Sequence, residues 1–435
     1  MKKTVVILLI FVMMLTGCSM LPSSDEKGGS SSKDSLWGKK FTIEKVPVPQ
    51  EAFDTGGAEK CWGMTPDGDA FLMSGGVVPY LYDPETNTVT PLIPADDVTR
   101  ETIREALKKQ ALDSGDLDQA ALQHEYERID ALEGEDLTEA MCTQKGVNYG
   151  LRVTSFQFYT NRNYMLAYSA NMNEILIDCY TGSYYSFGSG HIASAKDGTA
   201  LYIPAGQTSV VEVRDLSVGT VTEIDLGDCG FEYGAAVRSA VFLDDGSICA
   251  VMRDMKQDLK NGEACVLLIR GENGESTAYP LGNILFGREP DIIMPVGNDY
   301  IIMASTAFAR TQPVYMVDRK EGAVYLLVSK DQKIKALPLN GHLADNSLPE
   351  DISDEGAPFI PLQSMSDGET MLLWGLDVPG EMLLYHPSTR ETQSLADPEY
   401  NGFPSPIYFN GNRYDRFWMN SWNDFTDYTQ ITITE

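Results

Sequence analysis

The stretch MSDGETMLLW, Met365–Trp374, contains an Asp-Gly pair directly before an apolar run, and the chain repeats this arrangement. Similar stretches are MTPDGDAFLM at 64–73, SAKDGTALYI at 194–203 and LDDGSICAVM at 243–252. Asp-Gly between apolar segments is a strong hairpin signal, because Gly and Asp tolerate the positive φ angles of tight turns. The repetition therefore predicts an all-β fold built from copies of one hairpin-based unit.

Each copy continues with the same series of strands and turns. A loop, a second apolar strand, another turn and a last strand follow the first apolar run. The second turn recurs as DPETN at 83–87, YTGS at 180–183, ENGE at 272–275 and KEGA at 320–323. With three weaker copies included, four-stranded units begin near residues 60, 151, 191, 236, 290, 359 and 404.

Radial repetition of four-stranded sheets is the architecture of a β-propeller. The copies resemble TolB-like and WD40-like propeller repeats over most of residues 60–435. The resemblance implies an all-β, seven-bladed β-propeller, with six or eight blades as alternatives, and nothing about activity, because propellers host unrelated functions. The last unit lacks one strand, so we expect the strand-like segment 39–49 to close the ring by joining it.

The segment 96–144 departs from the strand pattern. Ile103, Leu107 and Ala111 form one apolar stripe at helical spacing, and Leu122, Tyr126 and Ile129 form another. The Asp-Ser-Gly stretch at 113–115 is typical of a helix end, and Asp116 or Asp118 can cap a second helix. We therefore expect a helical hairpin inserted between the first and second blades, within a propeller that spans 36–435.

The N-terminal residues indicate where the protein resides. Lys2 and Lys3 precede an apolar run, Val5–Leu15, which is too short to cross a bilayer and is typical of a signal peptide. The run ends in Leu15-Thr16-Gly17-Cys18, which resembles the bacterial lipoprotein lipobox. The resemblance implies removal of residues 1–17, lipid on Cys18 and anchoring to the extracytoplasmic face of the cell membrane. Residues 18–35, rich in Ser and Gly, are expected to form a flexible tether.

Charge and cysteine content restrict the classes of partner. The formal net charge is −30, and the loss of Lys2 and Lys3 would bring it to −32. Such a charge argues against nucleic acid as a partner. The six cysteines other than Cys18 show neither CxxC nor Cys/His metal spacing, and Cys249 and Cys265 are predicted either to pair or to remain buried thiols.

Candidate ligand-binding residues are those expected on the propeller face that carries the helical insert. On this face the connections vary most in length, and long loops on a rigid scaffold often bind ligands. The longest loops are expected at 204–209, 227–236, 253–264, 305–313, 340–358 and 420–428. Aromatic rings beside polar groups suit sugars and peptides, and arginines suit carboxylates. The candidates are Trp62, Arg152, His191, Arg238, Trp374 and Trp422.

Two classes of function remain open from the sequence. The favoured hypothesis is a membrane-anchored lipoprotein whose propeller is a non-catalytic binding or scaffolding module for an envelope protein, a peptide or a glycan. The alternative is an extracellular carbohydrate-active enzyme, a lyase or hydrolase on a propeller. The sequence contains no GxSxG, P-loop, GxGxxG or HExxH motif. No catalytic residue, cofactor or metal site is therefore predicted.

Overall fold

The structure is a computed structural model, in which Leu36–Glu435 forms one compact unit. The described residues are 35–55, 58–65, 69–74, 79–94, 100–115, 117–133, 136–137, 155–158, 164–168, 174–187, 190–206, 208–227, 229–231, 233–255, 264–283, 290–304, 314–330, 333–339, 359–365, 367–375, 382–395, 407–412, 416–421 and 424–434. Cys18, the predicted signal peptide and most of the predicted tether therefore lie outside the described residues.

The described strands fall into seven sheets. The first three in chain order contain β2 (Lys60–Met64), β3 (Phe71–Ser74), β4 (Tyr80–Asp83) and β5 (Thr88–Pro91); β7 (Ser155–Phe158), β8 (Tyr164–Tyr168), β9 (Glu174–Asp178), β10 (Ser183–Tyr185) and β6 (Ile93–Pro94); and β11 (His191–Lys196), β12 (Thr199–Ile203), β13 (Val210–Asp215) and β14 (Val221–Asp225).

The next two contain β15 (Ala235–Phe242), β16 (Ile248–Asp254), β17 (Ala264–Arg270) and β18 (Ser276–Asn283); and β19 (Ile292–Val296), β20 (Tyr300–Ala304), β21 (Val314–Asp318), β22 (Ala323–Lys330) and β23 (Lys333–Pro338). The last two contain β24 (Phe359–Ser364), β25 (Met371–Gly375), β26 (Met382–His386) and β27 (Glu391–Ser394); and β28 (Ile407–Asn412), β29 (Arg416–Ser421), β30 (Asp424–Thr434) and β1 (Lys40–Pro47).

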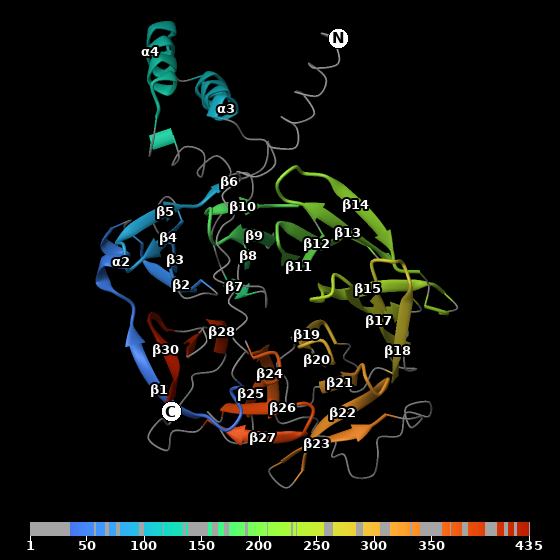
Figure 1. Cartoon of the computed structure of the whole chain (residues 1–435). Helices are drawn as coiled ribbons and strands as arrows, with labels where there is room; N and C mark the ends of the chain where they lie inside the picture. The colour runs from blue at the N-terminus through green and yellow to red at the C-terminus, as the bar shows by residue number, and fades with distance from the viewer. Residues whose placement is uncertain are drawn as a thin grey trace, which may run out of the picture. The chain divides into compact units, whose positions relative to one another are not determined.

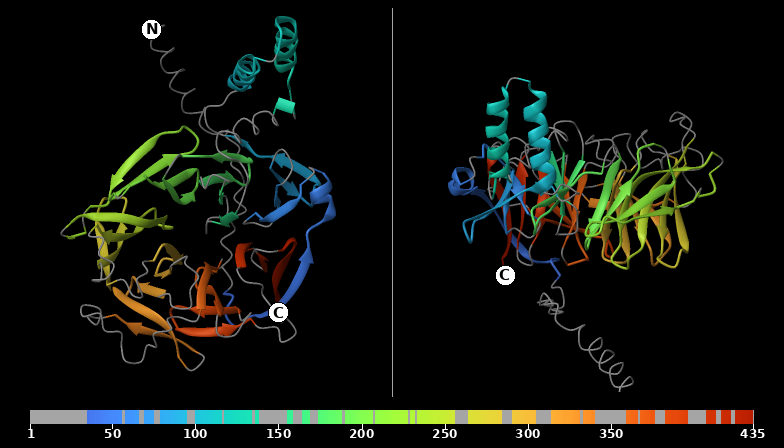
Figure 2. Two further views of the ribbon diagram at one scale, coloured as in Figure 1. Left: turned by 180° about the vertical axis from the view of Figure 1, so that it is seen from behind. Right: turned by 90° about the horizontal axis from the view of Figure 1, so that it is seen from above.

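The sheets stand around a common centre, with the first strand of each nearest that centre, as Figures 1 and 2 show. The fold is therefore a β-propeller, as the repeats predict. The innermost strands begin at residues 60, 155, 191, 235, 292, 359 and 407, each within four residues of the start expected from the sequence. Asp-Gly turns join the first and second strands, so they lie on one face of the ring, which we call the Asp-Gly face.

Apolar packing between neighbouring sheets forms the core. The middle strands are covered on both sides, and all five residues of β21 are buried. One cluster joins the β15–β18 sheet to the β19–β23 sheet through side chains such as Leu267, Ile301 and Leu326. Because both faces of a middle strand are buried, these strands are continuous apolar runs, whereas the outer strand β14 is largely exposed.

The turn between the third and fourth strands has a recurring construction. Asp178 and Asp318 each accept backbone N–H groups from the residues two and three positions later, which is an Asx turn. A residue with positive φ then ends the turn. It is Gly182, Gly219, Gly274 and Gly322 in four sheets, and Asn87 and Arg390 in two others.

The ring is closed by the two ends of the described chain. β1 pairs antiparallel with β30 along its whole length, from Lys40 opposite Thr434 to Pro47 opposite Asp427. This pairing confirms the predicted closing strand. Just before β1, the backbone N–H of buried Leu36 donates to Asp367 Oδ2 at 3.0 Å, in the Asp-Gly turn of the β24–β27 sheet. The folded unit therefore begins on the Asp-Gly face.

The predicted helical hairpin is present between β6 and β7. It consists of α3 (Arg100–Asp113) and α4 (Gln119–Asp130), and Asp118 Oδ1 caps α4 by accepting Ala121 N–H at 2.8 Å. Buried Ile103 belongs to a cluster that includes Ile93 of β6, which ties the hairpin to the ring. Figure 2 (right) shows both helices projecting beyond one side of the ring.

The remaining helix is α2 (Gln50–Asp54), which follows β1 and buries Ala52. Within the described part of the chain, no helix combines the length and the apolar character needed to cross a membrane.

Two details of the sequence interpretation are settled by the strands. The expected loop at 420–428 is wrong: β29 continues to Ser421, and β30 begins at Asp424, because the turn between them is short. Cys249 and Cys265 do not form a disulfide. The register places Cys249 opposite Ile269 and Cys265 opposite Arg253, so the two cysteines are not neighbours across the β16–β17 pair.

Removal of residues 36–49 should destabilise the ring, because it exposes the edge of β30 and removes the contact of Leu36 with Asp367. We expect the melting temperature to fall by several degrees, whereas deletion of 19–35 should leave it nearly unchanged. Thermal melts followed by circular dichroism measure both. Equal melting temperatures for the two deletion variants would contradict the closure.

Candidate functional site

A pocket lies between the β11–β14 sheet and the β15–β18 sheet and opens on the Asp-Gly face. Its volume is about 840 Å³. We call it the inter-sheet pocket; its lining is Lys196, Asp197, Thr199, Val213, Ile224, Phe242, Leu243, Asp244, Asp245, Gly246, Ile248, Arg270, Gly271, Glu272 and Gly274. Two Asp-Gly turns, at 197–198 and 245–246, form part of its rim.

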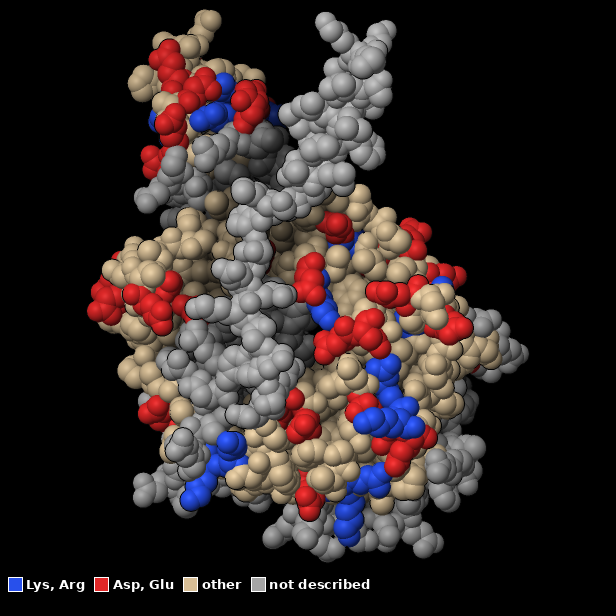
Figure 3. Space-filling view, viewed as in Figure 1, with Lys and Arg blue, Asp and Glu red and all other residues tan. Residues whose placement is uncertain are grey.

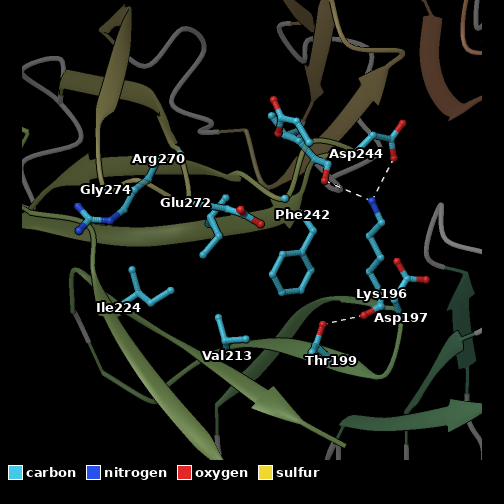
Figure 4. A pocket seen from close by; sticks show the side chains of 15 residues that line it. Lys196, Asp197, Thr199, Val213, Ile224, Phe242, Asp244, Arg270, Glu272 and Gly274 are labelled. Carbon is cyan, nitrogen blue, oxygen red and sulfur yellow. Dashed lines mark hydrogen bonds and ion pairs between the residues drawn. The ribbon is translucent and has the colours of Figure 1, made fainter. Parts of the chain in front are cut away.

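The base of the inter-sheet pocket is apolar. Val213 and Ile224 come from the two outer strands of one sheet, and Phe242 and Ile248 come from the two inner strands of the next. Figure 4 shows the side chains of Val213, Ile224 and Phe242 directed into the space between the sheets. Neighbouring sheets of a propeller diverge from the centre of the ring outward. At the base of the pocket, the side chains of the two sheets are therefore farther apart than they are near the centre.

The rim of the pocket carries more negative than positive charge. Lys196 Nζ donates to Asp244 Oδ1 at 3.2 Å and to the carbonyl oxygen of Leu243 at 3.3 Å, so its charge is already engaged (Figure 4). Asp197 and Glu272 are exposed and make no ion pair with the described residues. The rim therefore offers two carboxylates beside an apolar base.

Arg270 is the second cation of the pocket and is half-buried on β17. The pKa of Asp225 is lowered by a hydrogen bond from the backbone of Gly227, then by one from Ser209 Oγ, and further by the nearby charge of Arg270. The positive charge of Arg270 therefore lies near an acidic group of the neighbouring sheet, and it does not reverse the negative character of the rim.

A smaller pocket of about 620 Å³ lies between the same two sheets on the other face. Its lining is Thr208, Ser209, Asp225, Gly227, Gly234, Ala235 and Met255. Ile224 lines the inter-sheet pocket and Asp225 lines the smaller one, so the two pockets adjoin successive residues of β14.

Ion pairs join neighbouring sheets along the Asp-Gly face. Besides Lys196–Asp244, Arg319 Nη2 lies 3.3 Å from Asp245 Oδ2, and Arg390 Nη2 lies 3.5 Å from Glu321 Oε2. Figure 3 shows this interspersion of basic side chains among more numerous acidic ones. Because these pairs are partly exposed, each contributes little to stability.

His191 was predicted to contact a ligand, and the structure gives it a protein partner. Its Nδ1 lies 2.5 Å from Glu174 Oε1, and the other carboxylate oxygen of Glu174 accepts the N–H of Ile192 at 2.5 Å. Glu174 begins β9, so this contact joins two neighbouring sheets. The His191 side chain is 44% exposed, which leaves its ligand-binding role a prediction.

Two predicted residues occupy the same irregularity in different sheets. The register shifts between Cys61 and Gly63 and between Val237 and Ser239, so Trp62 and Arg238 are the extra residues of β-bulges in innermost strands. Ala193, Leu362 and Asn410 occupy corresponding bulges. A bulge redirects the side chain of the extra residue, and Arg238 is exposed in a strand that is otherwise mostly buried.

The other predicted residues are not brought together with these. Trp374 lies in β25, opposite Ile360 and Met382, so it belongs to a different sheet from Trp62 and Arg238. Arg152, Trp422 and the lipidation residue Cys18 lie outside the described residues.

Sequence reasoning missed the residues of the inter-sheet pocket. It interpreted Asp-Gly at 197–198 and 245–246 only as turns, and it placed binding on the opposite face. That preference for the face bearing the helical hairpin stays a prediction. A usable signal was present, because Lys196, Asp244 and Glu272 all lie within the repeated turns. The separation of the sheets, which creates the pocket, is not encoded in any single turn.

In the parts of the chain that the structure describes, no group of three or more His, Cys, Asp or Glu side chains is arranged to hold a metal ion. No protein-family model matches the chain, and no curated protein matches its sequence.

Solved propellers match the fold at low identity. The structure of U3-55K is 9% identical with a TM-score of 0.42, and the match covers 90% of this chain and 98% of that one. The RRP9 WD40 repeats are 9% identical with a TM-score of 0.43, covering 90% and 97%. Oligogalacturonate lyase from Vibrio parahaemolyticus is 11% identical with a TM-score of 0.42, covering 91% and 98%. At these values the likeness carries no information on activity.

The ion pair between Asp245 and Arg319 should make stability depend on pH. Burial acts to raise the pKa of Asp245, but hydrogen bonds from Ser247 and the Arg319 guanidinium outweigh it, and the pKa is lowered. A lowered carboxyl pKa stabilises the fold above the pKa of the unfolded chain, and this contribution disappears as pH falls through the folded value. Asp245→Asn should therefore lower stability at neutral pH by less than about 1 kcal/mol.

The decisive measurement is the difference in melting temperature between wild type and Asp245→Asn at about pH 6 and about pH 3. We expect the difference to shrink on acidification. Glu369→Gln, which changes an exposed carboxylate of another Asp-Gly turn, serves as the matched control. A difference for Asp245→Asn that stays constant or grows at acid pH would show that the ion pair does not stabilise the folded state.

Proposed function

We propose that the protein is a lipid-anchored binding module on the extracytoplasmic face of the cell membrane, and that its propeller binds a basic, partly apolar polypeptide segment of an envelope protein. The binding site is the inter-sheet pocket. The inter-sheet pocket combines an apolar base with a rim on which Asp197 and Glu272 make no ion pair with the described residues. This combination is the main support for the proposal.

The chemistry of the pocket favours a polypeptide over the other ligand classes. Sugar sites commonly present aromatic platforms, and Phe242 is the single aromatic residue in the lining of the pocket. Nucleic acid would be repelled by the acidic rim and by the net charge of −30. A segment that carries Lys or Arg beside aliphatic residues satisfies both the carboxylates and the apolar base.

Support for the anchor comes from the lipobox-like Leu15–Cys18 and from the position at which the folded unit begins. Leu36 is held on the Asp-Gly face by Asp367, and Gly38 N–H donates to Gln393 Oε1 at 2.7 Å on the same sheet. An anchor at Cys18 would therefore tether the propeller from its Asp-Gly face, the face on which the inter-sheet pocket opens.

Cys18→Ser should abolish lipid attachment and release the protein from membranes. Metabolic labelling with a fatty-acid analogue, followed by membrane fractionation, measures both effects. We expect label and membrane association in the wild type and neither in the variant, because the thiol is the acceptor that the lipobox resemblance implies. Equal labelling of both proteins would reject the anchor at Cys18 and would leave the binding site untouched.

Binding is tested with the full chain carrying Cys18→Ser and two acetylated, amidated seven-residue peptides, one of alternating Lys and Val and one of alternating Glu and Val. Calorimetric titration at low salt should detect binding of the Lys–Val peptide only. Glu272→Lys should weaken this binding by about fivefold or more, because it reverses a charge at the rim. Binding of neither peptide, or of both alike, contradicts the proposed ligand class.

The matched control is Glu369→Lys, which makes the same charge change on the Asp-Gly face of the β24–β27 sheet, away from the pocket. We expect Glu369→Lys to retain the affinity of the parent protein within about twofold, because screened charges act weakly over more than a Debye length of about 10 Å. An equal loss from both variants would mean that the peptide responds to net charge and not to the pocket.

A further inference from the structure

The outer wall of the inter-sheet pocket ends at the edge of β14. β14 pairs with β13 on one side, and no other described strand pairs with it. Leu226 N–H donates to the carbonyl of Ser209, and the carbonyl of Thr220 accepts the N–H of Asp215. The backbone N–H and C=O groups of successive residues point to alternate sides of a strand. Those of Val221, Glu223 and Asp225 therefore point away from β13. Figure 1 shows β14 at the outer rim of the ring.

Other outer edges carry features that discourage strand addition. Pro and Lys on an edge, bulges and covering segments all oppose it. β18 contains Pro280 and a bulge at Leu281. The remaining edges with such residues are β1 (Lys40 and Pro47), β5 (Pro91), β6 (Pro94) and β23 (Lys333, Lys335 and Pro338).

The edge of β27 is covered by the start of the folded unit. Gln393 of β27 accepts the N–H of Gly38 at 2.7 Å and donates to the carbonyl of Lys39 at 2.6 Å. β14, with the sequence Val-Thr-Glu-Ile-Asp, has no Pro, no Lys, and an unbroken register with β13. Among the described outer strands, it is therefore the one without Pro, Lys, a bulge or a covering segment.

The fold itself places an extra strand at this position in two other sheets. β6 adds in parallel to β10, and β23 adds antiparallel to β22. Both sheets thereby gain a fifth strand beyond the four of the repeated unit. A fifth strand on the outer edge is thus compatible with the geometry of this ring.

Apolar exposure gathers at the same edge. Val218 is 69% exposed and Val221 is 51% exposed, and both belong to the turn and strand of β14. Tyr233, 51% exposed, directly precedes Gly234 of the smaller pocket. A strand added to β14 would cover Val221 and would lie between the two pockets that adjoin Ile224 and Asp225.

The two faces of β14 differ in chemistry, and this difference sets the sequence of an added strand. Thr222 and Ile224 face the β15–β18 sheet, since their partners Val213 and Val211 pack in the cluster between these sheets. Val221 and Glu223 lie on the opposite face, where Glu223 is directly opposite Glu212 and the carboxylate of Glu212 pairs with Arg214 at 2.6 Å. Side chains of an added strand would therefore be apolar on the pocket side and basic on the other.

We propose that an extended polypeptide segment with alternating basic and apolar residues adds to β14 as a fifth strand of the β11–β14 sheet. Its apolar side chains enter the inter-sheet pocket, and its basic side chains along the strand face Glu223. Where the segment leaves β14 at the Asp-Gly face, a terminal basic side chain reaches the rim carboxylates Asp197 and Glu272. This inference rests on the proposed function, because it specifies how the ligand of the inter-sheet pocket binds.

The edge is tested by comparing Glu223→Pro with Glu223→Ala in the full chain carrying Cys18→Ser. Both variants remove the carboxylate, but only Pro removes the outward N–H, and the bonds to β13 come from the neighbouring residues. With the Lys–Val peptide as probe, Glu223→Pro should bind at least about fivefold more weakly than Glu223→Ala. Equal melting temperatures check that both variants fold, and equal affinities overturn the proposal.

A second measurement leaves the protein unchanged. One Lys–Val peptide is N-methylated at every Lys and another at every Val, so that each lacks donors on one of its two edges. Addition to β14 predicts that one of them loses binding and the other retains it, with the Lys-methylated peptide losing it if the strands are antiparallel. Equal affinity of the two methylated peptides overturns strand addition.

The outcomes separate this inference from the function on which it rests. If the wild-type chain does not bind the unmodified Lys–Val peptide, the proposed function fails. The other case is that the peptide binds and Glu272→Lys weakens the binding, while Glu223→Pro binds like Glu223→Ala and the two methylated peptides bind alike. Binding in the pocket is then supported, and strand addition is rejected.

Discussion

The backbone ladder between β1 and β30 is the constraint on which the ring depends. It joins residues nearly 400 positions apart in the chain, and it supplies the outer strand of the last sheet. Without it, the sheet that contains the C-terminal strands would keep three members and expose a long edge. The same segment carries Leu36 and Gly38, whose backbone groups bond to the preceding sheet. Closure therefore fixes both the integrity of the ring and the face on which the chain enters it.

Besides this ladder, side chains make most of the contacts between sheets, and a few backbone hydrogen bonds, such as Val237 N–H to the carbonyl of Thr208 at 2.9 Å, add to them. Apolar clusters supply most of this contact, and the Asp-Gly face adds ion pairs such as Arg319 with Asp245. These turns therefore serve packing as well as chain reversal: Asp367 bonds its own turn through the N–H of Glu369 and also holds Leu36. Between β14 and the β15–β18 sheet, the sheets are too far apart for apolar side chains to fill the space. The inter-sheet pocket lies there.

The fold was largely predictable because its signals are local and repeated. Asp-Gly turns, apolar runs and the strand character of 39–49 were enough to predict the propeller, the closing strand and the helical hairpin. Local signals also misled, since Trp422 and its polar neighbours suggested a loop where two strands meet. Arg390 adopts the positive φ that Gly occupies in other sheets, and its side chain contacts Tyr325 and Glu321 of the neighbouring sheet. Such a contact between sheets leaves no local signal.

The candidate site was much less predictable, for a physical reason. A pocket between sheets depends on the separation of two surfaces, and residues such as Ile224, Phe242 and Arg270 are ordinary in their own strands. The bulges that hold Trp62 and Arg238 depend on pairing with the next strand, which the sequence does not mark. The difference between the β14 edge and the other described outer edges is visible only when all these strands are compared.

Residue-resolved amide hydrogen exchange on the full chain carrying Cys18→Ser, with and without the Lys–Val peptide, measures directly whether a strand adds to β14. The amides of Thr222, Ile224 and Leu226 face β13 and should already exchange slowly, whereas those of Val221, Glu223 and Asp225 should exchange fast in the free protein. If a strand adds to β14, the peptide slows exchange of the Val221, Glu223 and Asp225 amides selectively. Protection confined to the loops of the opposite face, or absent from these three amides, would contradict strand addition.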